Sequence, residues 1–160
     1  MSALADGGVS VQLPDGWDGQ IRSAGQSAPE LHPPSAATSG SDGPRVLHAA
    51  NFALPAHRGD YGSGAVELMG GSNVLLCLLE HHRSGVDNAL FAHTGIPRLH
   101  AGMFSPQSMQ RAIPGMAGCQ QFFQAAGRPF CLYVVVGSWH TRGPLVRIAD
   151  AVVASIRVIG

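Results

Sequence analysis

The sequence predicts an α+β fold: a mainly antiparallel β-sheet with helical cover on its faces (an αβα sandwich). Residues 74–79 and 132–136 are apolar at every position, which is typical of strands buried on both faces. Turn residues separate most strand-like segments, so hairpin connections dominate and the strand–helix–strand rhythm of a parallel sheet is missing. A length of 160 residues fits one domain.

The amino-terminal elements follow from alternation and turn residues. Residues 1–8 are expected to form a flexible tail. Residues 9–13 alternate apolar and polar side chains, which predicts a strand with one buried face. The sequence Pro-Asp-Gly at 14–16 favours a turn, and residues 19–22 are expected to return as the second arm of a hairpin.

Residues 23–44 differ in composition from the rest, because Leu31 is their only large aliphatic side chain. A segment so rich in Ser, Ala, Pro and Gly cannot bury enough apolar area to offset its ordering entropy. We therefore expect a single domain over residues 9–160, with a disordered or flexible insertion at about 23–44.

Further strands are expected at residues 46–54, 65–69, 74–79 and 99–104. Ser105 suits the N-cap of a short helix that begins at Pro106.

The carboxyl-terminal third predicts a hairpin and a helix. Residues 119–124 and 130–136 read as strands around a turn in which Gly127 supplies a positive φ. A long helix is then expected from Pro144, because the apolar residues recur on one helical face. These residues are Leu145, Ile148, Ala149, Val152, Val153 and Ile156.

Composition excludes several partners. Ten Arg, with no Lys, balance ten Asp and Glu, and a neutral chain has no strong field to attract nucleic acid or an anionic membrane. The longest apolar run, 74–79, is too short to cross a bilayer, and residues 1–8 lack a signal sequence. We expect a cytoplasmic protein with no membrane insertion and no nucleic-acid partner. The use of Arg without Lys suggests G+C-rich codon usage, as in actinobacteria.

The three cysteines are an odd number with no C-x-x-C pair. Cys77 and Cys131 lie in apolar runs, so the cysteines are expected to be buried thiols in a reducing compartment. A disulfide between Cys119 and Cys131 is the alternative. Cys119 is also the one candidate nucleophile outside an apolar run.

Eight histidines are scattered along the chain without a helical metal-binding pair. His81 and His82 are adjacent and would point to opposite faces of a strand, so a metal site would need distant histidines to converge, with Glu80 or Asp60. A His-based metal binder is therefore the weaker alternative. His48 is expected to be a hydrogen-bonded core histidine.

No motif indicates a cofactor or a catalytic triad. The glycine-rich segments 62–64 and 70–72 precede neither a helix nor a lysine, and they read as turns rather than as phosphate-binding loops. The chain also lacks the G-x-S-x-G nucleophile elbow. No cofactor and no catalytic residue are assigned.

Two loops carry the candidate binding residues. Arg58, Asp60 and Tyr61 combine charge with an aromatic ring, and Trp139 and His140 follow a buried strand where a groove could form. Arg with an exposed aromatic ring is typical of interface hot spots. Ordinary loop residues are the alternative interpretation.

The segment Leu13-Pro14-Asp15-Gly16-Trp17 resembles the P-x-G-W hairpin at the start of Mog1/PsbP-like domains, which include actinobacterial LpqN-type relatives. The closing helix, which runs into residues 153–158, is similar to the end of these domains. The resemblance covers 9–22 and 144–159 by motif and the middle by element order. It implies an αβα sandwich and a non-enzymatic role in binding a protein or assisting assembly. The bacterial relatives are often lipoproteins, whereas this chain has no lipobox.

The leading hypothesis is therefore a protein-binding or assembly-assisting domain without a cofactor. A surface that is short of charge favours a protein partner or self-association as a homodimer. The alternative is a small-ligand-binding protein or hydrolase-type enzyme. Its pocket would lie near Arg58, Asp60, Tyr61 and His140.

Overall fold

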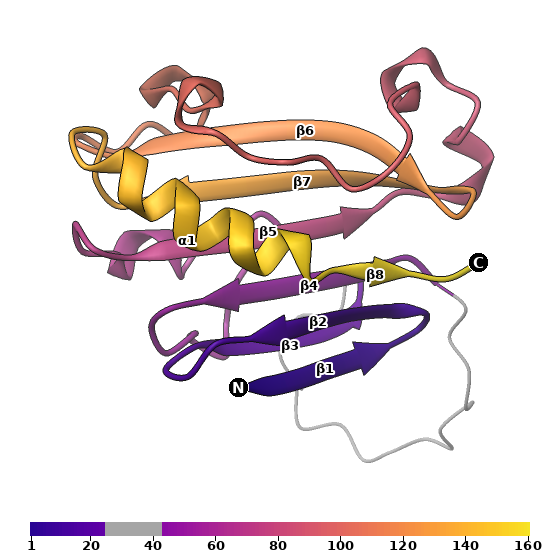
Figure 1. Ribbon diagram of the computed structural model, residues 1–160, viewed down its shortest axis with the longest axis horizontal. Helices are drawn as coiled ribbons and strands as arrows, with labels where there is room; N and C mark the ends of the chain where they lie inside the picture. The colour runs from indigo at the N-terminus through magenta and orange to yellow at the C-terminus, as the bar shows by residue number, and fades with distance from the viewer. Residues whose placement is uncertain (25–42) are drawn as a thin grey trace.

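The structure is a computed structural model that describes residues 1–24 and 43–160. These residues form eight strands in two antiparallel sheets and a single α-helix, which confirms an α+β class dominated by antiparallel sheet (Figure 1). The insertion predicted at about 23–44 falls almost entirely outside the described residues. Its two ends meet, because the Ala24 N–H donates to the Pro44 carbonyl at 2.8 Å.

The larger sheet has five strands in the order β3-β4-β5-β7-β6. The central strands, β5 and β7, are buried at every position, as predicted from their apolar runs. The β6–β7 hairpin turns at Ala126 and Gly127, both with positive φ, where a turn with glycine was expected. The strands are β3 (Asp18–Ser23), β4 (Arg45–Ala50), β5 (Val74–Glu80), β6 (Ala117–Ala125) and β7 (Arg128–Val136).

The smaller sheet contains the strands β1 (Ser2–Asp6), β2 (Val9–Leu13) and β8 (Arg157–Val158), in the order β1-β2-β8. The prediction of a flexible tail over 1–8 was wrong, because β1 pairs with β2 through a two-residue turn at Gly7 and Gly8. The predicted hairpin between 9–13 and 19–22 was also wrong. Both strands exist, but they belong to different sheets.

One face of the larger sheet is covered by α1 (Arg142–Ala154) and by the smaller sheet (Figure 1). The helix begins two residues before Pro144, and Ile148, expected on its buried face, is 41% exposed. In the described part of the chain, no helix has the length and apolar character to cross a membrane. The helix buries Leu145, Val146, Ala149, Val152 and Val153.

The opposite face is covered by loops, mainly residues 52–69 and 109–116, which pack over Cys77 and Tyr133. The strands predicted at 65–69 and 99–104 were wrong, since both segments hold short 3₁₀ turns. The helix predicted at residue 105 is likewise a single 3₁₀ turn, although Ser105 caps it as expected through its hydroxyl.

Candidate functional site

The predicted residues Arg58 and Asp60 lie in the loop after β4 and meet His48, which is fully buried. Arg58 Nε donates to His48 Nδ1 at 2.8 Å. His48 Nε2 lies 2.8 Å from the Asp60 carbonyl oxygen. The expectation of a hydrogen-bonded core histidine is confirmed.

The protonation state of His48 follows from these partners. A guanidinium only donates, so Nδ1 accepts and the proton lies on Nε2, which donates to the Asp60 carbonyl. Burial, with the nearby charges of Arg58 and Arg22, lowers the pKa of His48 to about 4. The ring is therefore neutral at pH 7.

Arg22 and Arg58 hold this loop on the sheet. Arg22 Nη2 donates to the Arg58 carbonyl at 2.9 Å and lies 3.3 Å from Asp60 Oδ1. Arg58 also donates from Nη1 to the Pro55 carbonyl and from Nη2 to Gln20 Oε1, each at 2.7 Å. The donors of Arg58 serve the fold itself, which favours a structural role for this cluster.

The remaining predicted residues are distributed over two places. Tyr61 packs edge-on against Tyr133, with ring centroids 5.7 Å apart. Trp139 and His140 lie in the turn between β7 and α1, where the Arg142 guanidinium sits 3.7 Å from the centre of the Trp139 ring. His140 is exposed. The structure thus brings Arg58, Asp60 and Tyr61 into one loop and puts Trp139 and His140 on another.

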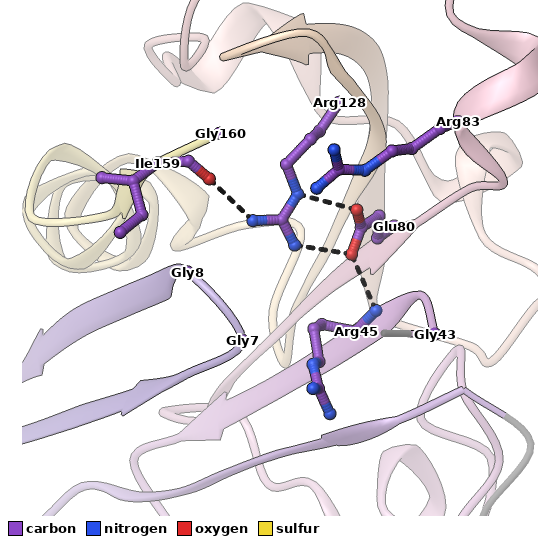
Figure 2. Close-up of a pocket in the computed structure, with 9 residues that line it drawn as sticks. All are labelled: Gly7, Gly8, Gly43, Arg45, Glu80, Arg83, Arg128, Ile159 and Gly160. Atoms are coloured by element: carbon purple, nitrogen blue, oxygen red, sulfur yellow. Dashed lines mark hydrogen bonds and ion pairs between the residues drawn. The ribbon is translucent and has the colours of Figure 1, made fainter. Parts of the chain in front are cut away.

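A pocket of about 610 Å³ opens where β5 ends and β7 begins, away from those loops (Figure 2). Three arginines and one glutamate contribute to its wall, together with the Gly7–Gly8 turn. Its lining consists of Gly7, Gly8, Gly43, Arg45, Glu80, Arg83, Arg128, Ile159 and Gly160.

Glu80 and Arg128 form a buried ion pair at this pocket, and each side chain is 4% exposed. Arg128 donates from Nε and Nη2 to the two carboxylate oxygens at 2.7 and 2.8 Å. The backbone N–H of Arg45 gives Glu80 a third hydrogen bond at 2.9 Å. Such bidentate, charge-assisted bonds fix the orientation of both side chains.

The same guanidinium ties the two sheets together. Arg128 Nη1 donates to the Ile159 carbonyl at 2.9 Å, and the Ile159 N–H donates to the Gly8 carbonyl at 2.9 Å. A Cβ on Gly8 would lie 2.7 Å from Arg128 Nη1, and one on Gly7 would overlap the Arg45 side chain. Both glycines have positive φ, so the turn needs glycine for conformation and for space.

The charges around the pocket are unequally compensated. Glu80 neutralises Arg128, and Asp6 lies 3.3 Å from the Arg45 guanidinium. Arg83 is exposed, and no carboxylate of the described residues lies within ion-pair distance of it. Figure 2 shows Arg83 reaching from the segment after β5 toward the Glu80–Arg128 pair. One guanidinium of the pocket is thus available to an anion.

The thiols do not contribute to this chemistry. Cys77, Cys119 and Cys131 are buried and free, as expected for small core residues, and the alternative disulfide was wrong. Burial raises the pKa of each thiol, so all three stay protonated and unreactive near pH 7.

Metal binding finds no support in the described part of the chain. There, no three side chains of His, Cys, Asp or Glu gather in a way that could hold an ion. His32 lies outside the described residues.

Sequence reasoning missed the pocket because its wall comes from five separate segments. Glu80 directly follows an apolar run and Arg128 precedes another, and only the antiparallel register brings them to the same end of the sheet. A charged residue beside a doubly buried strand is the signal that could have drawn attention to them.

Comparisons with protein-family models, curated proteins and solved structures gave no match to this chain.

Proposed function

We propose that the protein is a non-enzymatic binding domain that takes a small anionic ligand at the pocket of Arg83 and Arg128. This corresponds to the small-ligand alternative from the sequence, with a different pocket. The main support for this function is that the Arg83 guanidinium lines a pocket of about 610 Å³ and has no carboxylate partner among the described residues. Guanidinium groups match carboxylate and phosphate geometry.

Arg128 can assist Arg83. A guanidinium has five N–H donors, and three of those on Arg128 bind Glu80 and the Ile159 carbonyl. The other two have no acceptor among the described residues, so they can bind a ligand in the pocket that Arg128 lines. Because Glu80 and Ile159 hold the guanidinium in place, little side-chain entropy is lost when an anion binds to it.

Calorimetric titration with inorganic phosphate and with butyrate tests this function. We expect weak binding by the wild-type protein that decreases as salt is added, because the ligand is held by charge. Arg83→Gln should weaken this binding about tenfold, which corresponds to one charge-assisted contact of about 1.4 kcal/mol. Arg147→Gln is the matched control, since Arg147 is an exposed arginine of α1 that lines a different pocket.

Two outcomes would contradict the proposal. One is a wild-type protein that binds neither anion at low salt. The other is an Arg83→Gln variant that binds both anions as tightly as the wild type and the Arg147→Gln control.

Self-association is a second candidate, and the edge strand β1 favours it. Four of its five residues are exposed, and it ends the smaller sheet. Asp6 and Val9 flank the two-residue turn as a hydrogen-bonded pair, so Ala3 and Ala5 direct their backbone groups away from β2. An edge with unpaired backbone groups can pair with a second copy of the chain.

Light scattering on the purified chain tests this candidate. We expect a dimer that Ala3→Pro converts to monomers, because proline removes an outward N–H from the edge. Ala3→Ser keeps that N–H and should leave the dimer intact. A wild-type monomer at high concentration, or a dimer that tolerates the proline, would contradict it.

The fold family and location belong to the same proposal. We assign the chain to the Mog1/PsbP-like superfamily and to the cytoplasm. The packing of α1 on an antiparallel sheet supports the family. Three free, buried cysteines support a reducing compartment.

A further inference from the structure

A second pocket adjoins the one at Arg83. It has a volume of about 390 Å³ and shares Gly7, Gly8 and Ile159 with the first. The β1–β2 turn and the segment after β8 therefore border both pockets. The lining of the second pocket consists of Ala5, Asp6, Gly7, Gly8, Val9, Ser10, Arg157 and Ile159.

Arg157 is the cation of this second pocket. Its Nη1 donates to the carbonyls of Ala154, the last residue of α1, and Ile156, which follows the helix, each at 2.8 Å. Within residues 1–24 and 43–160, its Nε and Nη2 donors have no acceptor, and no carboxylate lies at ion-pair distance from it. Each pocket thus has one arginine whose charge is not compensated.

The side-chain charges confirm this imbalance. Among residues 1–24 and 43–160, the side chains that line the two pockets include four arginines and two acidic residues, Asp6 and Glu80. Four minus two leaves two positive side-chain charges among the described lining residues, whereas the formal net charge of the whole chain is zero. A ligand with two negative charges would neutralise them.

We propose that the ligand is a small linear molecule with an anionic group at each end, an inference that rests on the proposed function. One end binds at Arg83 and the other at Arg157. Ile159, which is 68% exposed and lines both pockets, lies against the apolar middle of the molecule. Dicarboxylates have this chemistry.

The experiment compares succinate, glutarate and adipate with the monocarboxylates of equal length, butyrate, valerate and hexanoate. Calorimetry at low salt should show the best dicarboxylate binding about fivefold more tightly than its matched monocarboxylate, the gain of one further exposed ion pair. Arg157→Gln should remove this gain, so that each dicarboxylate binds no more tightly than its matched monocarboxylate. Arg83→Gln should weaken both classes.

Two further variants control for charge and folding. Arg157→Lys keeps the charge but loses the planar group, and it should retain most of the gain even if the end of α1 loosens. Arg147→Gln should change neither class. Circular dichroism of each variant establishes that it is folded.

The outcomes separate this inference from the function on which it rests. If dicarboxylates bind no more tightly than monocarboxylates, or if Arg157→Gln keeps the gain, the two-ended ligand is refuted. In that case Arg83-dependent binding of a single anionic group still supports the proposed function. If no anion binds to the wild-type protein, both are refuted.

Discussion

Replacing Glu80 with alanine should lower the free energy of unfolding by about 3–5 kcal/mol, because it leaves a buried charge without a partner. The carboxylate accepts two bonds from Arg128 and one from the Arg45 backbone, and both charged side chains are 4% exposed. A domain with a typical stability of about 5–15 kcal/mol would lose a large part of it. Urea denaturation followed by circular dichroism measures the loss.

Two controls isolate the ion pair. Arg111 forms an exposed pair with Glu67 at 3.6 Å, and Arg111→Ala should cost less than about 1 kcal/mol. The double variant Glu80→Leu with Arg128→Met removes both charges and should be more stable than Glu80→Ala. A cost below about 1 kcal/mol for Glu80→Ala would contradict the buried, bidentate arrangement.

Acidification from pH 6.5 to about 4 should destabilise the protein by about 3 kcal/mol through His48. The pKa of His48 is about 4 in the fold and 6.5 in the unfolded chain, so the unfolded state binds the extra proton. The stability that neutral His48 contributes is complete above pH 6.5 and is lost as the pH falls toward 4. Protonation of Nδ1 would displace Arg58 and place two cations side by side, near Arg22.

The variant His48→Gln tests the origin of this slope. Its amide can still donate to the Asp60 carbonyl, but it does not titrate, so its stability should vary much less between pH 4 and 6.5. Protonation of Asp150 affects the stability at lower pH, because hydrogen bonds from Arg98 hold the pKa of that carboxyl below 3.8. Equal slopes for the wild type and His48→Gln in urea unfolding at several pH values would refute the assignment.

Short-range sequence patterns predicted those elements whose structure depends on residues that are close in the sequence. The apolar runs of β5 and β7, the turn at Gly127 and the apolar face of α1 all appear in the structure. The predicted strands at 65–69 and 99–104 failed because short apolar runs have no distinctive period. In the fold they are packed turns over the sheet or beside it, and tertiary contacts decide their conformation.

The amino terminus shows a different failure. The sequence Asp6-Gly7-Gly8 followed by alternating residues is a hairpin signal, and it was available from the sequence. The pairing of β2 with β8 was not, because it joins residues about 150 positions apart, Val9 with Val158. The cluster around His48 was partly predictable, because Arg58 and Asp60 lie close to His48 in the sequence. The pocket of Arg83 and Arg128 was not, because it depends on the register of the whole sheet.

The most direct test of the pocket is nuclear magnetic resonance of the arginine side chains during titration with inorganic phosphate. The chain has ten arginines and no lysine, so its guanidinium Nε–H signals form a small, assignable set. We predict that the signals of Arg83 and Arg128 move with added phosphate, whereas that of Arg147 stays in place. An unmoved Arg83 signal, or an equal shift of all ten, would contradict an anion site in this pocket.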